Sequence, residues 1–214
     1  MRMKICIDID STLTDFLTHA RDVASKMADE SPYHIDPERA ILLNYGSETP
    51  WPEWKSPNEI FGHDLWMEIL NRTHSPVEIL AQEPFENAVE IINRWIQVGH
   101  EVVFISSRDH DETAEATEQW LQKIRILDPR LICTGRAGSK IPTLIQEGID
   151  VLIDDRPQTL IEFAYETPDP VAAIGIKHEA NVCLSDVPAL DMVDSWSEIP
   201  RVLEARSQRY LLGI

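Results

Sequence analysis

Two aspartates separated by one residue follow the first apolar run of the chain. Asp8 and Asp10 come directly after Ile5-Cys6-Ile7, so their side chains share one side of an extended strand or splay apart where the strand ends. Two carboxylates so close repel each other, and a hard cation such as Mg2+ relieves that repulsion while it accepts phosphate oxygens beside them. Taken alone, the pair is explained equally well by a polar turn after a strand.

A second acidic pair occurs in the same setting later in the chain. Asp154 and Asp155 follow the apolar run Val151-Leu152-Ile153. If the two runs are neighbouring strands of a parallel sheet, both pairs gather at one edge, and that much negative charge is costly without a cation. The two pairs together therefore favour a metal site over two unrelated turns.

Hydroxyl and ammonium groups supply donors that suit a phosphate group. Ser106 and Ser107 end a third apolar run, where hydroxyls and backbone N–H groups can donate to phosphate oxygens. Lys140, 14 residues before Asp154, can place a positive charge at the same edge. Taken alone, a Ser-Ser pair is more typical of a turn or helix cap, and a lone lysine is more typical of the surface.

The elements that must position these residues alternate between strands and helices. Apolar runs predict five strands, and apolar residues at helical spacing predict two helices among them. This alternation is typical of an α/β protein with a Rossmann-like parallel sheet and helices on both faces, where ligands gather at the carboxyl ends of the strands. The predicted strands are residues 3–9, 101–105, 130–133, 151–153 and 171–176, and the predicted helices are residues 85–98 and 113–126.

A long segment interrupts the alternation after the first strand. Residues 15–83 are rich in Trp and Pro and contain helix-like pieces but no convincing strand, which predicts a small helical cap. We therefore expect residues 1–14 and 84–214 to form the core. Within the cap, residues 44–57 carry three prolines and are expected to form an ordered loop rather than a helix.

The charge of the chain limits its partners. Its 214 residues include 19 Lys and Arg against 37 Asp and Glu, a formal charge of −18. This field repels polyanions and anionic membranes, whereas a small phosphorylated molecule can still bind beside a divalent cation. Cys6, Cys133 and Cys183 lie far apart in apolar runs, which predicts reduced core thiols. With no signal-like N-terminus and no apolar run of about 18 residues, we expect a cytoplasmic protein.

In this order and strand context, the motifs resemble those of the haloacid dehalogenase superfamily. Within it, the chain is most similar to the 5'(3')-deoxyribonucleotidase family, and the resemblance covers nearly the whole chain, with a looser match in the cap. The superfamily resemblance rests on Asp8-x-Asp10-x-Thr12, Ser106, Lys140 and Asp154-Asp155. The closer resemblance rests on Leu13, Asp15 and Phe16 after the first motif, Leu152-Ile153 before and Arg156-Pro157 after the fourth, and a late Asp194-Ser195-Trp196 followed by Ile199.

This resemblance implies hydrolysis of a phosphomonoester in two steps. Asp8 would attack phosphorus and become a phosphoaspartate, whereas Asp10 would protonate the leaving alkoxide and then activate the hydrolytic water. One carboxylate must stay ionised as the nucleophile while the other carries a proton on demand. We therefore expect metal contact to keep Asp8 ionised and the Asp10 side chain, off the metal, to be free to titrate.

The resemblance also implies Mg2+ as the cofactor. Asp8, the backbone carbonyl of Asp10 and Asp154 would hold the ion, and Asp155 would orient this metal shell. Donors near the ion would bind the non-bridging phosphate oxygens and offset charge in the transition state. These implied phosphate-binding residues are Ser106 or Ser107, and Lys140.

A (deoxy)nucleoside monophosphate is the substrate that the closer resemblance implies. Phe16 matches an aromatic residue that packs on the nucleobase in the family, and Trp51, Trp54, Phe61 and Trp66 in the cap offer further stacking surfaces. Aromatic residues of a small cap more often form its own core or seal it against the main domain, so this alternative stays open.

The first motif departs from the family pattern at Ser11, a position that is commonly Gly, and no second phosphate-loop lysine is evident. If the turn needs a positive φ angle, Ser11 strains it. Two other functions also stay open, namely a phosphatase for another small phosphate ester such as a sugar phosphate, and a non-catalytic binding protein with the same fold. The sequence leaves a homodimer open as well.

Overall fold

A six-stranded parallel sheet forms the centre of the molecule, with the strand order β3-β2-β1-β4-β5-β6. The computed structural model describes residues 1–29, 61–110, 112–136, 139–177, 184 and 186–213. The strands are β1 (Lys4–Ile7), β2 (Glu101–Ser106), β3 (Leu131–Cys133), β4 (Val151–Asp154), β5 (Ala172–Ile176) and β6 (Leu190–Val193). The helices are α1 (Phe16–Asp29), α4 (His63–Thr73), α5 (Pro76–Ala81), α6 (Ala88–Gln97), α7 (Glu112–Lys123), α8 (Ile141–Glu147), α9 (Pro157–Glu166), the short η2 (Trp196–Glu198) and α10 (Ile199–Leu212).

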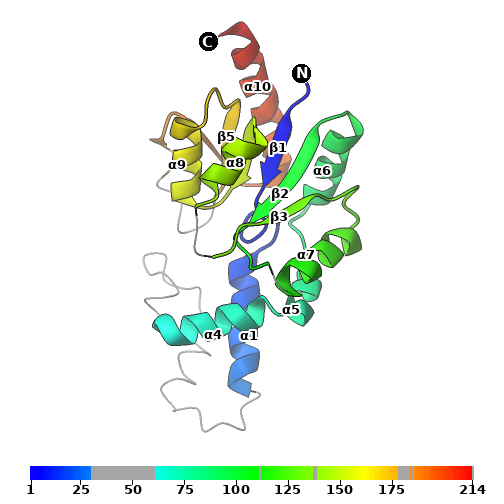
Figure 1. Ribbon diagram of the computed structural model, residues 1–214, viewed down its shortest axis with the longest axis vertical. Helices are drawn as coiled ribbons and strands as arrows, with labels where there is room; N and C mark the ends of the chain where they lie inside the picture. The colour runs from blue at the N-terminus through cyan, green and yellow to red at the C-terminus, as the bar shows by residue number, and fades with distance from the viewer. Residues whose placement is uncertain (30–60, 111, 137–138, 178–183, 185, 214) are drawn as a thin grey trace.

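Helices cover both faces of the sheet, and each face has its own apolar cluster. Successive strand side chains point to opposite faces, so Ile5 and Ile7 join one cluster while Cys6 joins the other. α6, α7 and α10 pack on the first face, and α8 and α9 pack on the second. Figure 1 shows α6 on one side of the sheet and α8 and α9 on the other. The predicted α/β, Rossmann-like fold class is confirmed.

The five predicted strands are all present, and their observed ends differ from the predicted ends by at most two residues. The helices predicted over 85–98 and 113–126 are observed as α6 and α7. Strand β6 was not predicted, because its sequence Leu190-Asp191-Met192-Val193 is short and interrupted by an acid. Its place at the sheet edge comes from parallel pairing with β5.

Helices α1 and α4 lie away from the sheet and share a third apolar cluster (Figure 1). α5 behaves differently, because its Ile79 belongs to the cluster of the first sheet face. Glu78 of α5 also pairs with Lys26 of α1 at 3.2 Å, so α5 connects the two groups of helices. The division into a core and a cap of residues 15–83 stays a prediction, and the loop predicted over 44–57 lies outside the described residues.

No helix among the described residues is long and apolar enough to cross a membrane. The thiols of Cys6 and Cys133 are buried and unpaired by disulfides, as predicted, whereas Cys183 lies outside the described residues. Burial raises the pKa of the Cys6 thiol well above its usual value and raises the pKa of Cys133 to about 11. Both side chains therefore act as small apolar groups of the core.

Candidate active site

The two acidic pairs meet because β1 and β4 are adjacent parallel strands. The register pairs Ile7 with Ile153, and the N–H of Asp8 donates to the carbonyl of Ile153 at 2.9 Å. Asp8 and Asp154 therefore leave their strands at the same edge of the sheet, at the carboxyl ends.

Lys140 lies between the two acids. Its Nζ atom is 2.7 Å from Oδ1 of Asp8 and 3.0 Å from Oδ2 of Asp154. The lysine is 3% exposed and stands at the start of α8, where Ile141 and Leu144 anchor the helix in the apolar cluster beneath. A buried ammonium group is thus held against two buried carboxylates.

Charge in this cluster is not balanced. Burial raises the pKa of Asp8 to about 6, because the opposing charge of Lys140 does not offset desolvation and the repulsion from Asp154 and Asp10. Burial also raises the pKa of Asp154, with Lys140 opposing and Asp155 reinforcing the shift. Burial lowers the pKa of Lys140, but Asp154 and Asp8 outweigh it, so that pKa lies above its usual value. The site holds more carboxylate than one ammonium group can neutralise.

The surplus carboxylates suit a divalent cation. Asp8, Asp154 and Asp155 each offer an oxygen within 4.8 Å of the others. Two donors orient this set, since the N–H of Arg156 donates to Oδ1 of Asp154 at 2.8 Å and the hydroxyl of Thr12 to Oδ1 of Asp155 at 3.4 Å. Three carboxylate oxygen ligands fit Mg2+ by number and hardness.

The Asp10 side chain is turned away from this set. Arg108 donates to both of its oxygens, from Nη2 to Oδ1 at 2.6 Å and from Nε to Oδ2 at 3.1 Å, while Nε2 of His74 lies 3.4 Å from Oδ2. Burial alone would raise the pKa of Asp10, but the charges of Arg108 and His74 hold it well below its usual range. The expectation that Asp10 is free to titrate does not hold in this arrangement, because Arg108 and His74 both favour its ionised form. Neither partner was expected from the sequence.

Ser106 and Ser107 lie where β2 ends, beside the acids of β1. The hydroxyl of Ser106 accepts a hydrogen bond from the N–H of Arg108 at 3.2 Å. The Ser107 hydroxyl is buried and has no partner among the residues that the structure describes. Among the described residues, the whole Ser107 hydroxyl is therefore available to a ligand oxygen, whereas the Ser106 hydroxyl already accepts one hydrogen bond.

The backbone of the first motif adopts a left-handed turn at Ser11, with φ of 61°. This is the conformation for which glycine is usual, so the departure at Ser11 carries a backbone cost. The turn lets the N–H groups of Leu13 and Thr14 both reach the carbonyl of Ile9, at 2.8 and 3.1 Å.

Three of the aromatic residues predicted to stack on a base, Phe16, Phe61 and Trp66, are packed within the α1–α4 cluster. Phe16 is 7% exposed, and its ring centroid lies 5.2 Å from that of His74. Phe61 and Trp66 stack on each other at 6.3 Å, so for these two the alternative of a local core holds. Trp51 and Trp54 lie outside the described residues.

Comparisons with known proteins match structure but not sequence. No protein-family model matches the chain, and no curated protein matches it by sequence. A HAD family hydrolase from Deinococcus radiodurans R1, solved with bound phosphate and sodium, matches with a TM-score of 0.59 and 15% identity over 96% of each chain. A HAD hydrolase of family IA, variant 3, from Entamoeba histolytica matches with a TM-score of 0.59 and 15% identity over 97% of this chain and 100% of the other. CbbY from Rhodobacter sphaeroides, in complex with phosphate, matches with a TM-score of 0.54 and 13% identity over 93% of this chain and 96% of the other.

The chain has the haloacid dehalogenase-like fold. At 13–15% identity, the likeness concerns the order and packing of elements, which here include the parallel sheet with helices on both faces. In this haloacid dehalogenase-like sheet, β2, β1 and β4 are consecutive, so the residues after them share one edge.

Arg108 and His74 are the residues of this site that the sequence did not single out. Arg108 directly follows Ser106 and Ser107 at the end of β2. Its position at the carboxyl ends of the strands could be predicted from the sequence, but its pairing with Asp10 could not. His74 caps the end of α4, where the sequence pattern gave no signal. It reaches the site through the packing of α4 against α1.

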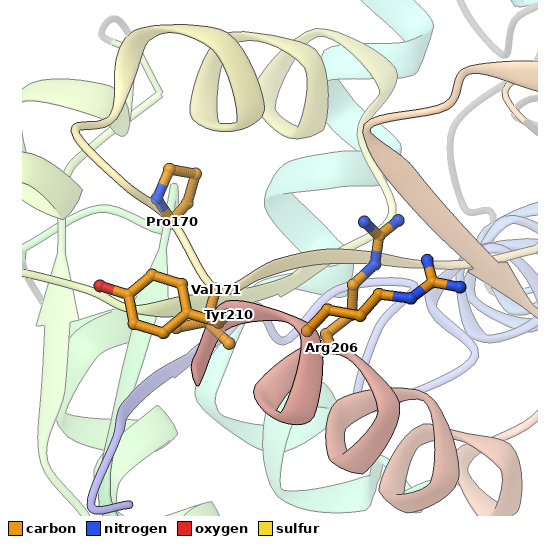
Figure 2. Close-up of a pocket in the computed structure, with 5 residues that line it drawn as sticks. Pro170, Val171, Arg206 and Tyr210 are labelled. Atoms are coloured by element: carbon orange, nitrogen blue, oxygen red, sulfur yellow. The ribbon is translucent and has the colours of Figure 1, made fainter. Parts of the chain in front are cut away.

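A pocket of about 500 Å3 lies at the amino ends of the strands, opposite the edge of the sheet that carries Asp8 and Asp154 (Figure 2). Pro170 and Val171 precede β5, so they lie at its amino end. The guanidinium of Arg206 is 2.5 Å from Asp191 of β6, which joins α10 to the edge strand of the sheet. The pocket is therefore separate from the carboxylate site. It is lined by Pro170, Val171, Arg206, Arg209 and Tyr210.

Proposed function

We propose that the protein is a Mg2+-dependent phosphomonoesterase that works through a phosphoaspartate. The observation that carries this proposal is the buried Lys140 between Asp8 and Asp154, with Asp155 beside them at the carboxyl ends of adjacent strands. Such a cluster pairs a carboxylate nucleophile with positive charge for a phosphoryl group. The haloacid dehalogenase-like fold supports the same reaction class.

The reaction has two steps in this proposal. An oxygen of Asp8 attacks phosphorus, the bond from phosphorus to the ester oxygen breaks, and the leaving alkoxide takes a proton from Asp10. A water oxygen then attacks phosphorus and gives a proton to Asp10, while the bond between Asp8 and phosphorus breaks and releases phosphate. The ion pair with Arg108 holds Asp10 ionised in the free site, so in this scheme Asp10 takes up its first proton as the negatively charged substrate enters.

The remaining residues bind the phosphoryl group and the cation. Lys140 and Ser107 have donors at the site, and they hold the non-bridging oxygens in this scheme. Asp8 and Asp154, with Asp155 beside them and the backbone carbonyl of Asp10, would hold Mg2+. When bound, Mg2+ offsets the negative charge of the nucleophile and of the transferring group.

We further propose that the substrate is a (deoxy)nucleoside monophosphate and that residues 15–83 form the cap that selects it. The motif resemblance to 5'(3')-deoxyribonucleotidases supports this choice. A second candidate is a small sugar phosphate, because Phe16 is buried and leaves little ring surface for a base. CbbY has been solved with xylulose-(1,5)bisphosphate, which supports this candidate for the shared fold. The buried free thiols support a reducing compartment such as the cytoplasm.

The test is phosphate release from a panel of nucleoside monophosphates and sugar phosphates, with Mg2+ and with a chelator. We expect turnover that needs Mg2+ and disappears in Asp8→Asn at equal folded concentration. Asp128→Asn is the matched control, because Asp128 is exposed and its positive φ angle suits asparagine as well.

Activity that persists in Asp8→Asn or without metal would rule out the proposed mechanism. Turnover confined to sugar phosphates would replace the nucleotide substrate but keep the reaction class. Absence of turnover on every ester would favour the non-catalytic binding protein.

A further inference from the structure

We propose that His74 and Arg108 are positioning residues that together orient the Asp10 carboxylate, so that α4 supplies part of the active site. This inference rests on the proposed phosphatase function and deepens it. Two separate parts of the chain contact Asp10, namely His74 at the end of α4 and Arg108 in the loop after β2.

Arg108 is built as a rigid support. Its side chain is 1% exposed and presents two N–H groups to the two oxygens of Asp10, a two-pronged contact that fixes the carboxylate plane. Its other donors are also engaged, because Nη1 donates to Thr117 at 3.0 Å and Nη2 donates to Gln82 at 2.9 Å. Arg108 is thus locked by α7 and by the end of α5, and it cannot swing away from Asp10 without losing these bonds.

His74 approaches the same carboxylate from α4. Its Nε2 atom lies 3.4 Å from Oδ2 of Asp10 and has no hydrogen-bond partner of normal geometry among the described residues, so this approach to the carboxylate is its polar contact there. The imidazole side chain is 10% exposed, and its ring packs beside Phe16 at 5.2 Å. His74 is thereby aimed at Asp10 by apolar packing.

A second contact joins the end of α4 to the loop after β3. Arg136, in the loop after β3, donates to Asn71 of α4 at 2.8 Å and lies 3.5 Å from Nδ1 of His74. The same guanidinium is 3.2 Å from a carboxylate oxygen of Asp109, just after Arg108. Contact between α4 and the loops after β2 and β3 therefore places His74 at Asp10, and loss of this contact would withdraw it.

The chemistry separates positioning from general structural support. With an activated aryl phosphate such as p-nitrophenyl phosphate, the leaving group needs no proton, so the first step does not depend on Asp10. The second step does, because Asp10 accepts the proton of the attacking water. A misplaced Asp10 therefore slows only the second step, and phosphoaspartate accumulates, whereas a loosened site slows both.

The experiment traps phosphoenzyme by acid quench during turnover of p-nitrophenyl phosphate and follows its decay in a chase. We expect His74→Ala to slow the decay by about 10-fold and Arg108→Lys by about 100-fold. Both values are at or below the lower end of the usual range for loss of acid–base catalysis, because the Asp10 carboxylate itself remains. His74→Gln keeps an N–H donor near the position of Nε2 and is expected to recover most of the rate. His63→Ala, at an exposed site in the first turn of the same helix, is the control.

The outcomes distinguish this inference from the function on which it rests. If the wild-type protein forms no phosphoenzyme and releases no phosphate, the proposed function fails. If the wild type is active but His74→Ala decays at the wild-type rate, or turns over more slowly without accumulating phosphoenzyme, the positioning role is overturned. The His74 series decides the matter even if Arg108→Lys does not fold.

Discussion

Lys140 lies 2.7 Å from Asp8 and 3.0 Å from Asp154, in a region from which water is largely excluded. Burying an ion pair costs desolvation energy that the attraction between the charges seldom exceeds by much. Here one ammonium group faces two carboxylates, and Asp155 adds a third within 4.8 Å of both. A buried ammonium group shared by two buried carboxylates is explained better by chemistry on a charged ligand than by stability.

Ser11 shows a cost of a different kind, since its φ angle of 61° is unfavourable for any side chain with a Cβ atom. We expect Ser11→Gly to raise the free energy of unfolding by about 0.5–1 kcal/mol. Glycine removes the backbone strain of the folded turn, and its greater flexibility in the unfolded chain cancels part of that gain. Urea denaturation followed by circular dichroism measures this change.

Ser11→Ala is the control for that substitution, because alanine keeps the Cβ atom and removes only the hydroxyl. We expect it to bring no stabilisation. Equal stabilisation by alanine and glycine would show that the hydroxyl, rather than the backbone angle, was the source of the cost.

At the scale of elements, the turn after β1 is held from the far end of the chain. Trp196, in η2, is fully buried and donates from Nε1 to the carbonyl of Thr12 at 2.8 Å, across 184 positions. Thr12 in turn contacts Asp155 and stands two residues after Asp10. η2 therefore supports the loop that follows Asp8 and carries Asp10.

We expect Trp196→Phe to lower both stability and turnover. The change leaves the buried Thr12 carbonyl without its donor, at a cost of about 1–3 kcal/mol in the free energy of unfolding. It also loosens the turn that carries Asp10, so kcat for phosphate release should fall at temperatures where the variant is fully folded. Chemical denaturation and steady-state kinetics measure the two effects.

Trp95→Phe is the matched control, since Trp95 packs against Trp196 at 6.3 Å in the same cluster but is not bonded to the turn. It should lose stability and keep kcat. If the two variants lowered kcat alike, the effect would belong to the shared cluster and not to the bond with Thr12.

At the scale of the whole molecule, the acids of the site link global stability to pH and to metal. Asp8 has a pKa of about 6 in the folded, metal-free protein, against an ordinary value of 3.8. A raised pKa contributes stability that is fully present below about 3.8 and is lost as pH rises through about 6. Asp154 shifts in the same direction, whereas Asp10, with a lowered pKa, contributes equally at pH 5 and pH 8.

The metal-free protein should therefore lose this contribution between pH 5 and pH 8, and a bound cation should restore it, because ions bind the deprotonated carboxylates. We expect Mg2+ to raise the melting temperature more at pH 8 than at pH 5. Thermal melts with Mg2+ and with EDTA at both pH values measure the difference.

The same melts with Asp8→Asn and Asp128→Asn provide the comparison. The first variant should reduce the response to Mg2+, and the second should leave it intact. An equal response at both pH values, or a full response in Asp8→Asn, would place the stabilising ion somewhere other than the site of Asp8, Asp154 and Asp155.

The sequence by itself determined five of the six strands that the structure describes, and it placed Asp8 and Asp154 at the ends of two of them. Long apolar runs are buried wherever they fold, and parallel strands bring their carboxyl ends to one edge, so Asp8 and Asp154 could be expected to meet. Lys140, 14 residues before Asp154, was one possible positive charge at this edge, although a lone lysine is more typical of the surface. These inferences depend on local pattern and on rules that all parallel sheets share.

Tertiary structure alone decided what surrounds Asp10. Its partner Arg108 is 98 positions away and His74 comes from a helix outside the sheet, so no local pattern could pair them. The same holds for the burial of Phe16, which depends on how α1 meets α4, and for β6, whose weak sequence becomes a strand by pairing with β5. Long-range contacts of this kind depend on which surfaces fit together, and that information is spread over the whole chain.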